Sequence, residues 1–204
     1  MTDASAHWDH IYTSIRSTEV SWYARDPAAS LRLVDMVASS PSVAVIDVGA
    51  GASLLVDRLL VDGFTDVTVL DVSQHALAET KQRLGEQAQH VTFVVHDILT
   101  WQAERQYDIW HDRAVFHFLT EDTHRDRYVE VAARAIRVGG GLVLATFAED
   151  GPTRCSGLSV SRSSAEDLER AFSGFFSLVE HEREAHVTPG GAVQNFTWAV
   201  FRRV

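Results

Sequence analysis

The chain has 204 residues, 46% of them hydrophobic and 23% charged, and its 18 basic and 28 acidic residues give a net charge of −10. This length and composition predict one globular domain that buries its own core. The acidic balance and the lack of any lysine and arginine cluster argue against a nucleic-acid partner.

Location is predicted from what the chain lacks. Its one cysteine, Cys155, excludes an intrachain disulfide and favours the reducing cytoplasm. No apolar run approaches the roughly 20 residues of a membrane span. The first residues resemble neither a signal peptide nor a transit peptide. We therefore expect a cytoplasmic protein without a membrane partner.

Residues 1–40 predict a helical segment that carries aromatic side chains. Asp26 and Pro27 are typical of a helix start, and Leu31 and Val34 then recur at helical spacing. Earlier in the chain, Trp8 and Tyr12 stand one helical turn apart, and Trp22-Tyr23 lie in a loop.

Residues 41–148 alternate between strand and helix patterns. The expected strands are 43–48, 66–72, 91–95, 107–111 and 142–147, and the expected helices are 52–62, 74–89 and 120–137, the last ending in a triple glycine. Runs of valine and leucine without polar alternation are typical of a parallel sheet that is covered on both faces. Repeated strand-helix-strand units predict an α/β fold with a Rossmann-like, doubly wound sheet.

Residues 149–204 differ from the alternating part. A polar loop leads to a helix over 164–172, opened by a capping box of Ser163 and Glu166. Strands over 175–184 and 193–201 flank the turn-rich segment 188–191, which predicts a C-terminal hairpin with an antiparallel last strand. We expect a single domain with a helical N-terminal lid (1–40), a cofactor-binding core (41–148) and an acceptor-side end (149–204).

Glycines and carboxylates stand where the first three strands end, and such sheets bind ligands at that edge. The first strand runs into Asp47, Gly49 and Gly51, and glycines allow a tight turn close to a ligand. About 20 residues further on, Asp71 is placed to accept hydrogen bonds from both hydroxyls of a ribose. The third strand ends in Asp97-Ile98, an acceptor for an exocyclic amine beside an apolar face for a flat ring.

A nucleoside with an amino-acid tail suits this edge better than a dinucleotide. Leu54 stands where the dinucleotide fingerprint requires a third glycine. Asp47 would repel a pyrophosphate but would attract a cationic amino group.

In order and interval, these residues resemble the nucleoside-binding signature of class I S-adenosylmethionine-dependent methyltransferases. Segment 111–119 is similar to one in a small bacterial subgroup of that family, and the likeness covers about residues 43–148. It implies S-adenosylmethionine as cofactor and S-adenosylhomocysteine as product. The chain departs from the pattern at Ser53, where many members carry glycine. The cofactor residues that we expect are Asp47, Gly49, Gly51, Asp71, Val72, Asp97, Ile98, His111 and Trp22.

Segment 111–119 also carries the candidate catalytic residues. We expect His117 to act as a general base that Asp112 orients, with His111 beside the cofactor. The alternative is that His117, between two phenylalanines, only packs in the core. Tyr12, Arg113, Arg154 and His186 are the candidate substrate-binding residues, and we assign no metal ligand. The aromatic N-terminal segment either closes over the cofactor or packs on the sheet.

These features favour O-methylation of a small hydroxylated metabolite, such as a saccharide, with help from the His/Asp base. N-methylation of a small amine or a protein lysine is the alternative. A nicotinamide oxidoreductase and a non-catalytic nucleoside-binding module are two further classes, and a homodimer remains open.

Overall fold

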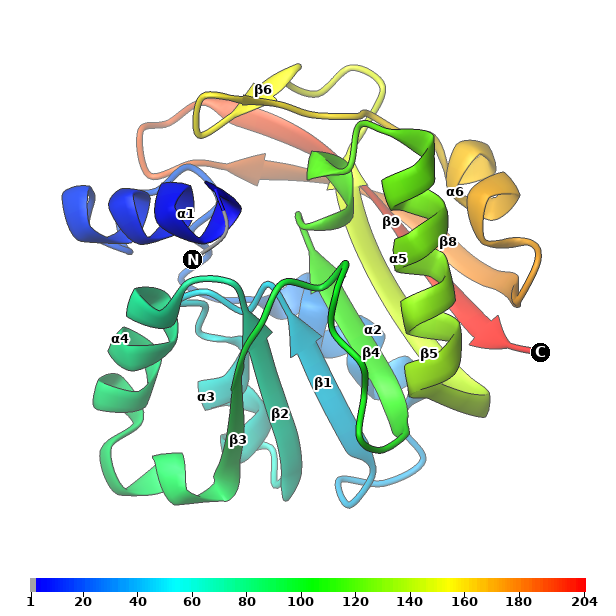
Figure 1. The fold of residues 1–204 in the computed structure, drawn as a ribbon, viewed down its shortest axis with the longest axis horizontal. Coiled ribbons are helices and arrows are strands. Elements are labelled where there is room, and N and C mark those ends of the chain that lie inside the picture. The colour runs from blue at the N-terminus through cyan, green and yellow to red at the C-terminus, as the bar shows by residue number, and fades with distance from the viewer. Residues whose placement is uncertain (1–2) are drawn as a thin grey trace.

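The computed structural model describes residues 3–204, and a seven-stranded sheet forms its centre (Figure 1). The strand order is β3-β2-β1-β4-β5-β9-β8. Five strands are parallel: β1 (Ala44–Val48), β2 (Asp66–Asp71), β3 (Val91–Val95), β4 (Tyr107–Arg113) and β5 (Ile136–Phe147). Strand β9 (Val193–Arg203) runs antiparallel to β5 and to β8 (Phe176–Val187). The predicted Rossmann-like sheet with five parallel strands and a C-terminal hairpin is confirmed.

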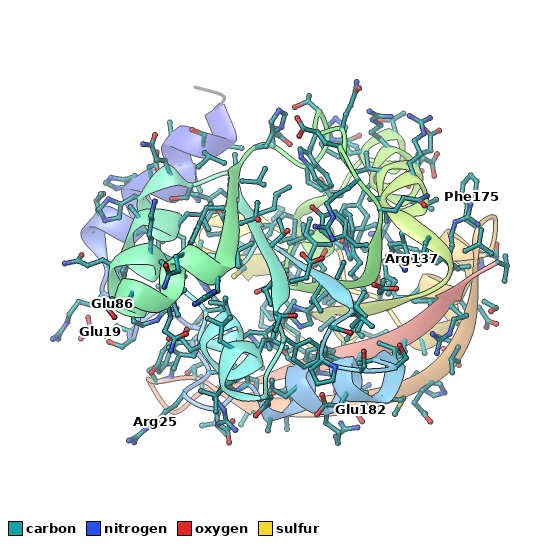
Figure 2. All side chains as sticks on the ribbon, turned by 90° about the horizontal axis from the view of Figure 1, so that it is seen from below. Glu19, Arg25, Glu86, Arg137, Phe175 and Glu182 are labelled. Carbon is teal, nitrogen blue, oxygen red and sulfur yellow. The ribbon has the colours of Figure 1, made fainter. Side chains whose placement is uncertain are left out.

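Helices cover both faces of the sheet. The helices α2 (Ala28–Val37), α3 (Leu55–Val61) and α4 (Gln74–Leu84) pack on one face, and α5 (Asp122–Ala135) and α6 (Ala165–Phe172) pack on the other. Successive β1 residues serve the two cores in turn, because Val45 belongs to the first and Ile46 to the second. This double burial explains the unbroken apolar strands. Charged side chains such as Glu19, Arg25 and Glu86 are exposed at the surface (Figure 2).

Three predicted helices have different limits in the structure. The helix expected over 52–62 begins only at Leu55, because the glycine bend extends further. Helix α4 ends at Leu84, and a 3-10 turn, η1 (Gly85–His90), follows. Helix α5 ends at Ala135, and the triple glycine lies in strand β5 instead of ending the helix. A Cβ on Gly141 would stand 2.8 Å from the Val37 side chain, so glycine there allows α2 to pack closely.

Two predicted helix starts are wrong by one residue. Ser164 and Asp167 form the capping box of α6, in place of Ser163 and Glu166, with both hydrogen bonds at 3.1 Å. Pro27, not Asp26, is the N-cap of α2, and no side chain caps that helix. The first error arises because two neighbouring serines suit the same cap position, and the second is within the usual one-residue uncertainty of a helix end.

The N-terminal segment and the acceptor-side loop meet over the carboxyl ends of the parallel strands. Helix α1 (Asp3–Ser14) lies across this edge and contacts α4 (Figure 1). The loop after β5 contains a small hairpin of β6 (Arg154–Cys155) and β7 (Leu158–Ser159), which the sequence analysis does not predict. Among the helices of residues 3–204, none has the length and apolar character needed to span a membrane.

Candidate active site

The glycine bend after β1 closes over the end of β2. Gly49 and Ala50 donate backbone hydrogen bonds to the Leu70 carbonyl at 2.7 and 3.1 Å. Gly49 has φ 66° and Gly51 has φ 51°, a region that favours glycine. A Cβ on Gly49 would also lie 1.9 Å from the Val115 side chain. The backbone therefore passes close to the turn after β4, with no room for a side chain.

Asp71 holds this bend in place from the end of β2. Its Oδ2 accepts the N–H of Gly51 and its Oδ1 accepts the N–H of Ser73, both at 2.8 Å. The carboxylate is 7% exposed. Burial raises the pKa of Asp71 to about 6, although the two backbone donors act in the opposite direction. Each oxygen keeps a further lone pair that can accept a hydroxyl group.

The end of β3 supplies a second polar position. Asp97 Oδ1 accepts the N–H of Leu99 at 2.9 Å, which fixes the turn after the strand. The His96 Nδ1 lies 3.0 Å from the Asp97 carbonyl oxygen. Ile98 is buried beside them and presents an apolar side chain.

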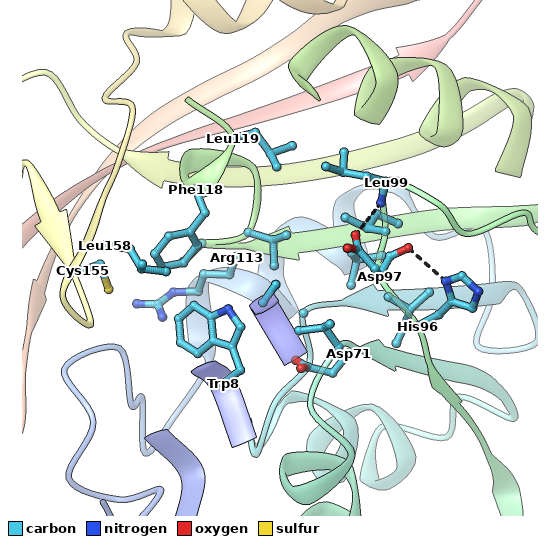
Figure 3. A pocket seen from close by; sticks show the side chains of 18 of the residues that line it. Trp8, Asp71, His96, Asp97, Leu99, Arg113, Phe118, Leu119, Cys155 and Leu158 are labelled. Atoms are coloured by element: carbon cyan, nitrogen blue, oxygen red, sulfur yellow. Dashed lines mark hydrogen bonds between the residues drawn. The ribbon is translucent and has the colours of Figure 1, made fainter. Parts of the chain in front are cut away.

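A cavity of about 270 Å³ joins these strand ends (Figure 3). Six of the predicted cofactor residues line it: Trp22, Gly49, Asp71, Val72, Asp97 and Ile98. A smaller cavity of about 60 Å³ adjoins it and contains Asp47 and His111 in its wall. Three residues line both cavities: Trp22, Gly49 and Arg113. Gly51 contributes through its hydrogen bond to Asp71.

His111 is engaged with Asp47. Its Nδ1 donates to Asp47 Oδ1 at 2.7 Å, and its Nε2 lies 2.9 Å from the Ser30 hydroxyl. Both members of the pair are buried, with side chains 3% and 4% exposed. The imidazole therefore orients the carboxylate in the wall of the smaller cavity.

The predicted catalytic pair of Asp112 and His117 is not formed. Asp112 accepts hydrogen bonds from the Tyr128 hydroxyl and from the N–H groups of Val115 and Phe116, at 2.8 and 3.1 Å for the two N–H groups. Burial raises the pKa of Asp112 to about 6. These contacts make Asp112 the support of the turn after β4.

His117 lies in the core, as the alternative interpretation has it. Neither ring nitrogen has a hydrogen-bond partner among the described residues. The centre of the His117 ring lies 4.4 Å from that of Phe118 and 4.6 Å from that of Phe147. Burial lowers the pKa of His117 to about 3, and the charge of Arg113 lowers it further. The side chain does not line either of the two adjoining cavities of the described chain.

The structure brings two of the four predicted substrate-binding residues to the cavities. Tyr12 lines the larger one, and burial raises its pKa. Arg113 lines both. Arg154 is exposed and donates to the Gly157 carbonyl. His186 Nε2 donates to the Ser21 carbonyl at 2.9 Å, outside both cavities.

Helix α1, the segment after β4 and the loop after β5 add residues to the site that the sequence does not predict. The centre of the Trp8 ring lies 5.8 Å from that of Trp22 and 5.0 Å from that of Phe118, and both contacts are edge-on. Its spacing from Tyr12 is the signal that could have identified it. The other unassigned residues that form this apolar end of the cavity are Leu119, Cys155 and Leu158.

Asp9 attaches α1 to the rest of the chain. Its Oδ1 accepts the Ser73 hydroxyl at 2.6 Å and the His75 N–H at 3.1 Å. Ser73 is also the N-cap of α4, so this carboxylate lies at a helix N-terminus, where negative charge is favourable. In the part of the chain that the structure covers, no group of three or more His, Cys, Asp or Glu residues could hold a metal ion.

Comparison with known proteins shows that a large part of the chain is similar to methyltransferases. Residues 45–140 match the model of a methyltransferase domain. The eEF1A lysine and N-terminal methyltransferase of Mus musculus is 21% identical over 152 residues, 70% of this chain and 21% of that protein. Malonyl-[acyl-carrier protein] O-methyltransferase 2 of Ilyobacter polytropus is 22% identical over 112 residues, 52% of this chain and 40% of that protein. The alignments thus span less than half of either relative.

A solved structure shares the whole fold. The N-methyltransferase NodS of Bradyrhizobium japonicum, in complex with S-adenosyl-L-homocysteine, superposes with a TM-score of 0.74 at 16% identity. The superposition covers 98% of this chain and 99% of NodS. At this identity, the likeness concerns the fold.

Proposed function

The chain belongs to the class I S-adenosylmethionine-dependent methyltransferases, and on that premise we propose that it methylates an oxygen atom of a small, largely apolar acceptor. One observation carries the proposal. The cavity that begins at Asp71 and Asp97 continues, without interruption, to an apolar end formed by Trp8, Phe118 and Leu158. A cofactor end and an acceptor end therefore lie in one space.

The residues at the cofactor end fit S-adenosylmethionine. Asp71 is placed to accept the ribose hydroxyls, and Asp97 with Ile98 suits the amine and the flat face of adenine. Asp47, in the adjoining cavity, suits the ammonium group of the methionine part. NodS, which has the same fold, was solved with the demethylated product. When bound, S-adenosylmethionine supplies a methyl group that is already activated for displacement.

The acceptor end favours an oxygen that is ionised before the reaction. A general base typically contributes 10²–10⁴-fold, but His117 faces the core and Asp112 supports a turn. A carboxylate or an acidic hydroxyl needs no base, and positioning alone contributes up to about 7–11 kcal/mol. Aromatic and aliphatic walls also fit an apolar body better than the saccharide that the sequence suggested. The Ilyobacter relative is named as an O-methyltransferase.

N-methylation is the second candidate, and the same observation favours it. An amine with a free lone pair also needs no base, so an acceptor end without a histidine–carboxylate pair suits it equally. The mouse relative is named for lysine and N-terminal methylation, and NodS is named as an N-methyltransferase. The acceptor would then be a small amine or a protein lysine.

Transfer of label separates these proposals. The purified protein is incubated with methyl-labelled S-adenosylmethionine and either a small-molecule extract or cell protein. We expect label in small molecules, released by mild base if an ester forms and resistant if an ether or amine forms. Label in macromolecules alone would overturn the small acceptor. Failure to bind S-adenosylhomocysteine in calorimetry would overturn methyl transfer itself. The single buried Cys155 agrees with a cytoplasmic site for this activity.

A further inference from the structure

We propose that Arg113 binds a carboxylate on the acceptor, so that the substrate is an apolar or aromatic carboxylic acid. This inference rests on the proposed methyl transfer. The carboxylate that Arg113 binds orients the acceptor in the cavity, and the methyl group can be transferred to this carboxylate or to another oxygen of the same molecule.

Arg113 is a partly buried cation with a donor nitrogen that has no acceptor in the described part of the chain. It is the last residue of β4, and its side chain is 13% exposed. Nη1 donates to the Trp22 carbonyl at 2.9 Å, while Nη2 makes no hydrogen bond within residues 3–204. A guanidinium carries five N–H donors, and a buried donor left without an acceptor costs free energy. The arrangement suits a ligand that brings its own negative charge.

The neighbours of Arg113 compensate its charge only in part, through one distant ion pair with Glu184. Glu184 Oε1 is the nearest carboxylate oxygen that the structure pairs with it, at 4.0 Å, and the other oxygen of Glu184 accepts the Trp198 indole N–H at 2.8 Å. The guanidinium carbon lies 4.6 Å from the centre of the Phe196 ring, a cation–π contact that brings no negative charge. The positive charge also helps to lower the pKa values of His117 and His186. A carboxylate placed here would meet a favourable potential.

The position of Arg113 defines the shape of the acceptor. Figure 3 shows its guanidinium pointing toward Cys155 and Trp8, while Asp71 and Asp97 stand at the other end of the cavity. An anionic acceptor is therefore repelled from the cofactor end and attracted to the apolar end. Because a guanidinium matches a carboxylate with two parallel hydrogen bonds, it also fixes orientation.

The methionine part of the cofactor is a second group that Arg113 could bind in the same way. It carries a carboxylate, and Arg113 lines the smaller cavity together with Asp47. Two measurements distinguish these groups. Binding of S-adenosylhomocysteine reports on the cofactor carboxylate, and binding of acids to the protein already saturated with S-adenosylhomocysteine reports on the acceptor.

The test uses a graded series of acids and their neutral amides, from acetate through phenylacetate and 3-phenylpropionate to 2-naphthylacetate. Calorimetry measures each on the saturated protein. We expect at least one acid of the series to bind about tenfold or more tightly than its amide, a difference of about 1.4 kcal/mol. Arg113→Met should abolish the preference and leave the affinity for S-adenosylhomocysteine within about twofold. Arg113→Lys, which keeps the charge and loses the two-pronged geometry, should retain part of it.

Arg154→Met is the matched control, because this arginine is exposed and outside both cavities. It should keep the full preference for acids. Three results would overturn the inference: equal binding of acids and amides across the series, an unchanged preference in Arg113→Met, or a tenfold loss of S-adenosylhomocysteine affinity in that variant. If Arg113→Met does not fold, an unchanged preference in Arg113→Lys overturns it instead. A protein that binds S-adenosylhomocysteine but no acid refutes only this inference, and the proposed methyl transfer stands.

Discussion

Asp71 Oδ2 accepts the backbone N–H of Gly51 at 2.8 Å, so the carboxylate that faces the cofactor cavity also fixes the glycine bend. The bend and the carboxylate are thereby positioned before any ligand arrives, which reduces the entropy cost of binding. Burial of the same carboxylate raises its pKa to about 6. Ligand binding and proton binding at Asp71 should therefore be linked.

We expect the affinity for S-adenosylhomocysteine to increase as the pH rises toward about 6 and then to level off. A ribose hydroxyl donates to the ionised carboxylate, so binding lowers the pKa of Asp71 and releases a proton below that pH. In the absence of ligand, the raised pKa of Asp71 affects the stability of the protein, and stability falls as the pH rises. The folded state then holds the proton more tightly than the unfolded state, and the contribution of Asp71 to the free energy of unfolding falls as the pH rises from 3.8 to about 6.

Calorimetry at several pH values, in buffers of different ionisation enthalpy, measures both the affinity and the number of protons released. Asp71→Asn should weaken binding and flatten its pH dependence. Asp112→Asn controls for the pH dependence alone: Asp112 also has its pKa raised to about 6 but does not line the cavity, so this variant should keep the rise of affinity toward pH 6 even if the altered turn weakens binding. An Asp71→Asn protein with the wild-type pH dependence would contradict the linkage.

Gly49→Ala should abolish cofactor binding and destabilise the fold. The new Cβ would stand 1.9 Å from the Val115 side chain, and the backbone has φ 66°. Strain of this kind costs about 1–3 kcal/mol, and movement of Val115 distorts the cavity wall. Gly85→Ala is the matched control, because Gly85 has φ 56° and no atom within 4 Å of the added Cβ. It should lose about 1–3 kcal/mol of stability and bind S-adenosylhomocysteine normally. Equal losses of affinity in the two variants would mean that φ strain alone explains the effect.

Local signals in the sequence predict the sheet and the cofactor edge. An apolar strand that is buried on both faces can be recognised from a few neighbouring residues. The same is true of glycines and aspartates at a strand end. The pattern around Asp47, Gly49 and Asp71 therefore predicts the cofactor edge without any knowledge of distant contacts. Helix limits depend on tertiary pairing as well, since Ile136 suits both α5 and β5, and the pairing of β5 with β4 decides between them.

The acceptor side depends on contacts between distant segments, which the sequence does not reveal. Trp8, Phe118 and Leu158 meet because α1 and the hairpin after β5 both fold over the sheet edge. Asp112 and His117 are close in sequence, but the turn between them includes Ala114 at φ 77° and directs the two side chains to different surroundings. Their proximity in sequence suggested a pair that the turn prevents.

Asp9→Ala should loosen α1 and weaken cofactor binding while leaving the core intact. Asp9 accepts two hydrogen bonds at the start of α4, and α1 contributes Trp8 and Tyr12 to the cavity. Hydrogen bonds to a charged group contribute roughly 1.5–3 kcal/mol each, so an affinity loss of about tenfold is expected when α1 detaches part of the time. Hydrogen exchange should become faster in residues 3–14 and at the His75 amide, which loses its acceptor, and stay unchanged in the strands. The exposed neighbour His10 provides the control, and His10→Ala should exchange and bind like the wild type. Unchanged affinity in Asp9→Ala would show that α1 does not close the cofactor site.

His117→Phe separates a packing role from a catalytic one. Both ring nitrogens lack hydrogen bonds among the described residues, and the ring packs against Phe118 and Phe147, so phenylalanine should fit with equal or greater stability at neutral pH. The kcat/KM value, measured with the acceptor that label transfer identifies, should stay within about twofold.

The effect of pH on this variant gives a second measurement. The folded-state pKa of His117 is lowered to about 3, so below its usual 6.5 the unfolded state takes up a proton that the folded state refuses. The wild type therefore loses stability as the pH falls, by about 2 kcal/mol from this residue at pH 5, and His117→Phe should not. Chemical denaturation at pH 5 and 7 tests the difference. A fall of 100-fold or more in kcat/KM, with stability preserved, would instead restore His117 as a general base, since a residue that only packs has no reason to affect the rate.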